Sequence, residues 1–137
     1  MKSDPELRAK GLELRDRLYG GQLGEQMNDH YRELSPDLET VAIEWVIGGL
    51  LARPGLDLVK RELVAIASCV GANEPMGVAA HAQGALRVGA TPDEIFEAIF
   101  QCFPYAGLAA VIHSLEAVND ILTAARNGAA SDGPERT

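Results

Sequence analysis

Helix boundaries are the clearest structural signal in this chain. Thr91-Pro92-Asp93-Glu94 places an N-cap, a first-turn proline and a capping-box glutamate at the offsets that begin an α-helix. Ser3-Asp4-Pro5-Glu6 has the same spacing. Alternation of apolar and polar residues with a period of two, which is typical of strands, is hard to find. The sequence therefore predicts an all-α fold of about six to seven helices.

Apolar residues recur at helical spacing in segments that glycine and proline separate. The predicted helices cover residues 3–18, 22–33, 35–51, 57–72, 75–88, 92–103 and 105–126. Gly89 is expected to be the C′ residue of the fifth of these helices, and Pro104 is expected to end the sixth. Residues 127–137 are predicted to form a disordered tail.

Composition restricts the kind of protein this is. Apolar residues make up 47% and charged residues 23% of the 137 residues, which fits one folded domain, placed here at 1–126. A net charge of −8 repels nucleic acid and anionic lipid.

The longest apolar run, residues 63–72, is shorter than the roughly 20 residues that span a bilayer. MKSDPELRAK carries acids where a signal peptide is apolar. We expect a cytoplasmic protein with a small-molecule substrate and no nucleic-acid or membrane partner.

A carboxyl group lies beside the apolar stripe of the predicted 57–72 helix. Glu62 and Cys69 are two helical turns apart, and Ile66 lies between them on the same stripe. A carboxyl group in this position can act as a general acid or base. The alternative is an exposed Glu62 that pairs with Lys60 or Arg61.

Histidine supplies the second candidate group. His81 lies among small residues that leave space around an imidazole, which can donate or accept a proton near neutral pH. The alternative is a core histidine bonded to a carbonyl or a carboxylate. His113 has Glu116 at i+3, and a surface pair is the simpler reading. The histidines show no metal-ligand spacing beyond that one pair, and no phosphate-binding loop is present. We therefore predict neither a metal nor a cofactor.

The two cysteines, Cys69 and Cys102, have no Cys-x-x-C spacing, which suits a reducing compartment. Cys69 is expected to fill core volume. The aromatic residues at helical spacing are expected in the core or at a subunit interface: Trp45, Phe96, Phe100 and Phe103.

About half of the chain resembles the carboxymuconolactone decarboxylase family. The resemblance lies in ARPGLDLVKRELVAIASCVGAN and in AAHAQGALRVGATPDEIFEAIFQCFPYAGLAAVIHSLEAVNDIL. Its parts are the RPGL turn, the EL-x-x-I-A helix, the H-x-x-G-A-L helix, the GAT-x-D-E-I cap and the YAG helix start. The resemblance implies an AhpD-like all-α fold that assembles as a homo-oligomer, a trimer or a hexamer, with active sites near subunit contacts.

The AhpD-like thiol peroxidase branch of this family uses a Glu, a Cys-x-x-C pair and a His nineteen residues after the Glu. Glu62 and His81 have this interval, but Glu74 and Gly77 stand at the cysteine positions. Without the dithiol, a peroxidase function is not expected. The resemblance therefore implies the cofactor-free decarboxylase branch.

Decarboxylation of a carboxymuconolactone leaves a carbanion that the conjugated lactone carbonyl delocalises, so the substrate supplies its own electron sink. The resemblance implies His81 as the proton donor or dienolate stabiliser, with Glu62 orienting it. Lys60, Arg61 and Arg53 are implied as contacts for the substrate anion. Tyr105 in the YAG motif is expected either to reach a ligand or to pack at an oligomer contact.

Three classes of function stay open at this point. The first is a carboxy-lyase that acts on a small carboxylated lactone resembling 4-carboxymuconolactone. The second is a tailoring enzyme on the same scaffold that cyclises, isomerises or opens a lactone in a larger substrate. The third is an oligomeric binding protein without catalysis, in which Glu62 and His81 have structural roles only.

Overall fold

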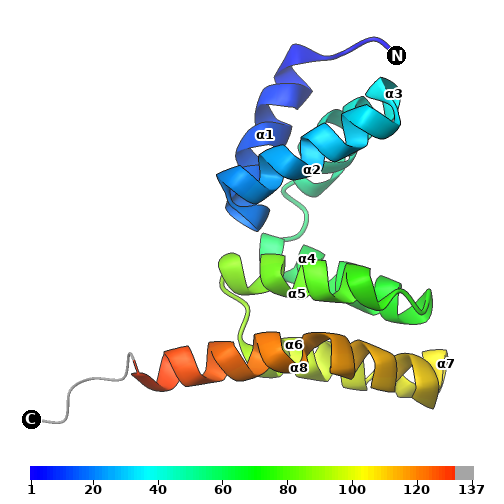
Figure 1. Ribbon diagram of the computed structural model, residues 1–137, viewed down its shortest axis with the longest axis vertical. Helices are drawn as coiled ribbons and strands as arrows, with labels where there is room; N and C mark the ends of the chain where they lie inside the picture. Colours follow the sequence, from blue (N-terminus) through cyan, green and yellow to red (C-terminus); the bar gives the residue numbers. More distant parts are fainter. Residues whose placement is uncertain (132–137) are drawn as a thin grey trace, which may run out of the picture. The chain divides into compact units, whose positions relative to one another are not determined.

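The computed structural model describes residues 1–131, which are almost entirely helical (Figure 1). No strand occurs among these residues, so the all-α prediction is confirmed. The elements are α1 (Pro5–Tyr19), α2 (Gly21–Leu34), α3 (Pro36–Thr40), the π-helix η1 (Val41–Leu51), α4 (Leu58–Gly71), α5 (Pro75–Arg87), α6 (Pro92–Phe100), α7 (Phe103–Ala106) and α8 (Leu108–Ser131).

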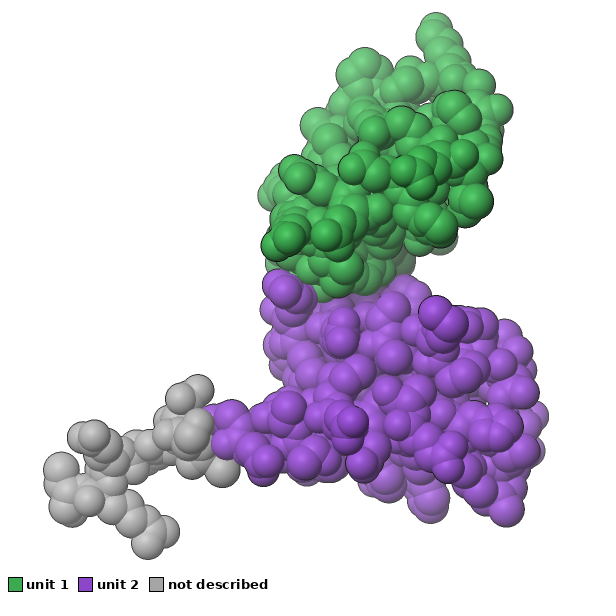
Figure 2. All heavy atoms as spheres, viewed as in Figure 1, with its two compact units in different colours: residues 1–58 green, residues 59–137 purple. Residues whose placement is uncertain are grey.

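The chain forms two compact units, coloured separately in Figure 2. Unit 1 is Met1–Leu58 and holds α1 to η1, whereas unit 2 is Val59–Thr137 and holds most of α4 and all later helices. The assignment of residues 1–126 to a single domain stays a prediction.

In unit 1, helix α1 and the π-helix approach each other through glycines. A Cβ atom at Gly11 would lie 2.0 Å from the Ile43 carbonyl oxygen, and one at Gly48 would lie 2.0 Å from the Leu7 carbonyl oxygen. Only glycine permits this backbone contact. The sequence predicted an ordinary α-helix over 35–51, because helical spacing of apolar residues does not distinguish i→i+5 from i→i+4 hydrogen bonding.

Buried carboxylates join α1 to the helices that follow α2. Arg8 donates to Glu39 Oε1 at 2.7 Å and to Glu44 Oε1 at 3.3 Å. Glu44 also accepts from Ser3 Oγ and from the Asp4 N–H, each at 2.6 Å. Burial favours the protonated carboxyl, but these hydrogen bonds outweigh it and hold the pKa of Glu44 below its ordinary value. The network therefore anchors the start of the chain to η1.

Unit 2 has the larger apolar core. Its buried side chains come from α4, α5, α6 and α8, and include Ile66, Val70, Val78, Ala82, Ala85, Ile95, Ile99, Val111, Val118 and Leu122. These positions recur every three or four residues within each helix, which is the pattern that predicted the helices. Burial of these faces packs α4 and α5 together with α6 and α8.

The expected helix boundaries are confirmed where the cap signal is complete. Thr91 and Glu94 form both hydrogen bonds of a capping box, and Gly89 follows α5 with φ +106°. The predicted capping box at Ser3 is wrong. Asp4 is the N-cap of α1, while Ser3 bonds to the distant Glu44. A tertiary hydrogen bond has replaced the local one.

The C-terminal third differs from the prediction at two boundaries. Helix α6 ends at Phe100, and the expected single stretch to residue 103 gives way to the short α7 that contains Pro104. Helix α8 continues to Ser131, so Asn127-Gly128 does not end it, and the disordered tail stays a prediction. An isolated glycine costs a helix only about 1 kcal/mol relative to alanine. Residues 132–137 of the predicted tail lie outside the described residues.

Several aromatic side chains expected in the core or at an interface are exposed. Trp45, Phe100 and Phe103 expose 58%, 53% and 47% of their surface, so a core position is wrong for all three. Phe96 is partly buried and stacks on Phe100 with ring centroids 5.5 Å apart. The alternative of a subunit interface stays a prediction.

Helix α8 is long and apolar enough, by length and composition, to cross a membrane over residues 108–129. The expectation of no membrane partner, which rests on the shorter apolar run of residues 63–72, stays a prediction. However, Val111, Val118 and Leu122 of α8 lie in the core of unit 2. Length and composition alone do not place α8 in a membrane, because a core helix of a soluble protein meets the same criteria.

Candidate active site

Glu62 of α4 and His81 of α5 meet side chain to side chain in unit 2. The distance between His81 Nδ1 and Glu62 Oε2 is 2.9 Å. The Glu62 side chain is 1% exposed, and the His81 side chain is 26% exposed. The pair therefore joins a buried carboxylate to an imidazole that reaches the surface.

The apolar stripe of α4 explains the burial of Glu62. Ile66 and Val70, one and two turns further along the helix, are fully buried in the core of unit 2. Glu62 continues this stripe, so its carboxylate faces α5 rather than solvent. An exposed Glu62 that pairs with Lys60 or Arg61 is therefore wrong.

Small residues of α5 leave room for the imidazole. Ala82 and Ala85 face the core, whereas His81 lies at the edge of that face. An ionised carboxylate can only accept hydrogen bonds, so Nδ1 carries the proton when Glu62 is ionised. Nε2 is then the ring nitrogen that can exchange a proton with a ligand. The predicted alternative of a histidine bonded to a carboxylate describes the contact itself and is compatible with a catalytic role.

A second group of residues lies between the end of α4 and the start of α5. It consists of Cys69, Glu74 and Gly77. Glu74 is the N-cap of α5, and its side chain accepts a hydrogen bond from the Gly77 N–H. A Cβ atom at Gly77 would lie 2.8 Å from the Cys69 sulfur. Burial, followed by the charges of Glu74 and Glu62, raises the pKa of the Cys69 thiol. This thiol is therefore a weak nucleophile at neutral pH.

This cluster was not predicted from the sequence. Glu74 and Gly77 were noted only as the positions where the thiol peroxidase branch has cysteines. The available signal was Glu74-Pro75, an acidic residue before a first-turn proline.

The remaining predicted site residues are placed as follows. Lys60 is exposed and Arg61 is partly buried, and both flank Glu62 on α4. Tyr105 of α7 is 90% exposed. Arg53 belongs to unit 1, where it lines a cavity between α1 and residues 51–58. The structure thus brings Glu62 and His81 together, while the roles of these four residues as substrate contacts stay predictions.

The two remaining candidates, His113 and Cys102, each contact another residue of unit 2. His113 Nδ1 lies 3.3 Å from Asn73 Oδ1, so the expected pairing of His113 with Glu116 is not the contact formed. Cys102 is buried and its thiol donates to the Ala98 carbonyl at 3.2 Å, and burial raises its pKa. Among the described residues no group of three His, Cys, Asp or Glu side chains could hold a metal ion.

The fold and the pair together define a helical protein with a carboxylate–imidazole pair that is suited to acid–base chemistry. Comparison of the sequence with known families identifies the family of this protein. The chain belongs to the carboxymuconolactone decarboxylase family, because a model of that family matches residues 42–120, more than half of the chain.

Two relatives of known function are similar over most of their length. The nitrosuccinic acid decarboxylase npaB of Metarhizium robertsii is 26% identical over 117 residues, or 82% of each chain. The 4-carboxymuconolactone decarboxylase of Acinetobacter baylyi is 28% identical over 108 residues, which is 79% of this chain and 81% of the relative. Both relatives are named as decarboxylases, and their names give different substrates.

Proposed function

We propose that this protein is a cofactor-independent carboxy-lyase that decarboxylates a small carboxylated lactone. His81 and Glu62 would carry out the acid–base chemistry. The observation that carries the proposal is the 2.9 Å contact between His81 Nδ1 and Glu62 Oε2, with a buried carboxylate and a partly exposed imidazole. Membership of the family and the names of both relatives support a decarboxylase.

The reaction needs one proton and an electron sink. The bond between carbon and the carboxylate breaks, its electron pair passes to an acceptor in the substrate, and carbon dioxide leaves. His81 Nε2 then gives a proton to the carbon, and the imidazole recovers a proton from solvent through its exposed edge. Glu62 holds the ring in position and balances the charge of the doubly protonated imidazole.

A second substrate is favoured by the name of one relative. In nitrosuccinic acid, a nitro group can accept the electron pair that decarboxylation releases, as the conjugated carbonyl does in a carboxymuconolactone. The same proton donor would serve both substrates. The proposal therefore covers carboxylates whose own substituent stabilises the carbanion, with 4-carboxymuconolactone as the first choice.

The test is turnover of 4-carboxymuconolactone and of nitrosuccinate, followed as release of carbon dioxide. We expect the wild-type protein to decarboxylate one of them, and His81→Ala to lose at least 100-fold in kcat/KM, the scale of general acid–base catalysis. His113→Ala, a histidine outside the pair, is the matched control and should keep its activity. Full turnover by a well-folded His81→Ala would refute the proposed role. Absence of turnover by the wild-type protein would favour the tailoring or binding functions.

We also propose that the protein is a homo-oligomer. Phe100, Phe103 and Leu108 are exposed and line an apolar groove of about 630 Å³ in unit 2. Contiguous exposed apolar surface of this kind marks interaction sites. Light scattering of the purified chain should give a mass of at least two copies, and a monomer of 14.6 kDa would contradict the proposal.

A further inference from the structure

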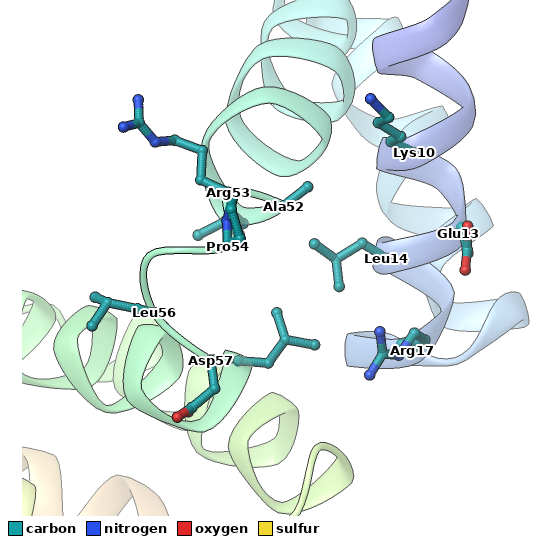
Figure 3. A pocket seen from close by; sticks show the side chains of 11 residues that line it. Lys10, Glu13, Leu14, Arg17, Ala52, Arg53, Pro54, Leu56 and Asp57 are labelled. Atoms are coloured by element: carbon teal, nitrogen blue, oxygen red, sulfur yellow. The ribbon is translucent and has the colours of Figure 1, made fainter.

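Unit 1 contains a cavity whose lining includes neither Glu62 nor His81. It has a volume of about 460 Å³, and its walls are one face of α1 and residues 51–58, which run from the end of η1 to the start of α4 (Figure 3). A volume between about 300 and 1,000 Å³ is typical of small-molecule sites. Its lining consists of Lys10, Glu13, Leu14, Arg17, Leu51, Ala52, Arg53, Pro54, Leu56, Asp57 and Leu58.

The α1 wall has a cation at each end and an apolar residue between them. Lys10, Leu14 and Arg17 are spaced at i, i+4 and i+7, which places them on one helix face. Leu14 is 6% exposed and points into the cavity. Lys10 pairs with Glu6 at 2.7 Å, but an exposed pair of this kind contributes little and exchanges readily with a ligand.

The facing wall is apolar at its centre. Leu51, Leu56 and Leu58 lie in it, with Arg53 at its outer edge. The carboxylates of Glu13 and Asp57 point away from the space between the walls in Figure 3. Over the whole lining the cations outnumber the carboxylates by one, in a chain whose net charge is −8.

We propose that this cavity binds a small monocarboxylate with an apolar body. The carboxylate lies at Arg17, whose planar guanidinium matches a carboxylate with two parallel hydrogen bonds, and Lys10 adds a second positive charge. The apolar body lies against Leu14 and the leucines of residues 51–58, where burial of apolar surface favours binding. A single excess cation in the lining matches one carboxylate.

The proposal is tested by titration of the full, ¹⁵N-labelled chain with sodium benzoate at low salt, with benzamide as the uncharged probe. We expect benzoate to shift the backbone amides of residues 10–17 and 51–58, and benzamide to bind more weakly. Arg17→Gln should weaken benzoate binding about fivefold, the most that one exposed charge contact usually contributes. Arg126→Gln is the matched control, because Arg126 is an exposed arginine of unit 2. The Arg126→Gln variant should bind benzoate with the affinity of the wild type.

Three results would overturn the inference. These are amide shifts confined to residues around His81, equal affinity for benzoate and benzamide, and unchanged affinity in Arg17→Gln. Because Arg17 is exposed, its replacement should leave the thermal midpoint unchanged. Lys10→Gln provides a second variant with the same expected direction. None of these results depends on decarboxylation, so the inference can fail while the proposed function stands.

Discussion

Glu44 in unit 1 and Glu62 in unit 2 are both fully buried carboxylates on helices, yet their surroundings differ. Glu44 accepts hydrogen bonds from a hydroxyl, a backbone amide and a guanidinium, Arg8. Glu62 meets the imidazole of His81, which is partly exposed. The groups around Glu44 hold it as a fixed anion, whereas the imidazole beside Glu62 is a group that can either donate or accept a hydrogen bond. Burial alone therefore does not distinguish these two carboxylates; their partners do.

Between the two glutamates, the larger expected effect on activity comes from Glu62→Gln. The amide keeps the shape of the side chain but removes the charge that orients and balances the imidazole, so kcat should fall by about 100-fold. The thermal midpoint should change little, since the amide oxygen can still accept from Nδ1. Steady-state kinetics and thermal unfolding of the same preparation separate the two quantities. If Glu62→Gln kept the wild-type kcat, Glu62 would have no larger role in catalysis than Glu44.

Glu44→Gln should have the opposite profile. One amide cannot satisfy Ser3, the Asp4 N–H and Arg8 together, so we expect unfolding to become easier by about 2 kcal/mol. The activity per folded molecule should stay within about twofold of the wild type, because a remote structural residue carries no transition-state contact. Urea unfolding measures the first quantity. Glu6→Gln, which breaks only an exposed pair with Lys10, is the matched control and should cost under about 0.5 kcal/mol.

Acid should weaken the unit 1 network. The hydrogen bond from Arg8 lowers the pKa of Glu39, and the pKa of Glu44 is also lowered from its ordinary value of 4.5. A lowered pKa in the folded state gives stability that is present above the ordinary value and is lost as pH falls through the folded value. Urea midpoints between pH 7 and pH 3 should therefore decline more steeply for the wild type than for Glu44→Gln. Parallel declines in the two proteins would show that Glu44 makes no such contribution.

The smallest expected effect is in unit 2, away from the pair. Thr91→Ala removes the side-chain half of the α6 capping box and should cost about 1 kcal/mol. Activity should be unchanged, which would show that a modest loss of stability in unit 2 does not by itself impair the site. Urea unfolding and turnover under the same conditions provide both values. A loss of activity as large as that of Glu62→Gln would mean that the site depends on the stability of the whole unit.

Local signals predicted much of this fold, and contacts between distant residues account for the errors. The capping box at Thr91 and the helical spacing of Ile66 and Val70 act within a few residues, so the sequence alone reveals them. Ser3 bonds to Glu44, forty-one residues away, and no local pattern predicts such a partner. Gly48 of the π-helix packs closely against the backbone of α1, which is also a contact between residues distant in the sequence.

The site was predicted in part for the same reason. Glu62 and His81 were both identified as candidates, and the family spacing related them, but their contact follows from the packing of α4 on α5. The cluster of Cys69, Glu74 and Gly77 was missed because its members are unremarkable residue types. The cavity in unit 1 was missed because Lys10 and Arg17 resemble ordinary surface cations in the sequence.

The most direct test of the central claim is a double-mutant cycle of kcat/KM for decarboxylation, with wild type, Glu62→Gln, His81→Gln and the double variant. If the two residues act as one acid–base unit, the double variant should be no slower than His81→Gln alone, because residues that act together show non-additive losses. Losses that multiply, or a Glu62→Gln variant with wild-type kcat/KM, would contradict the account.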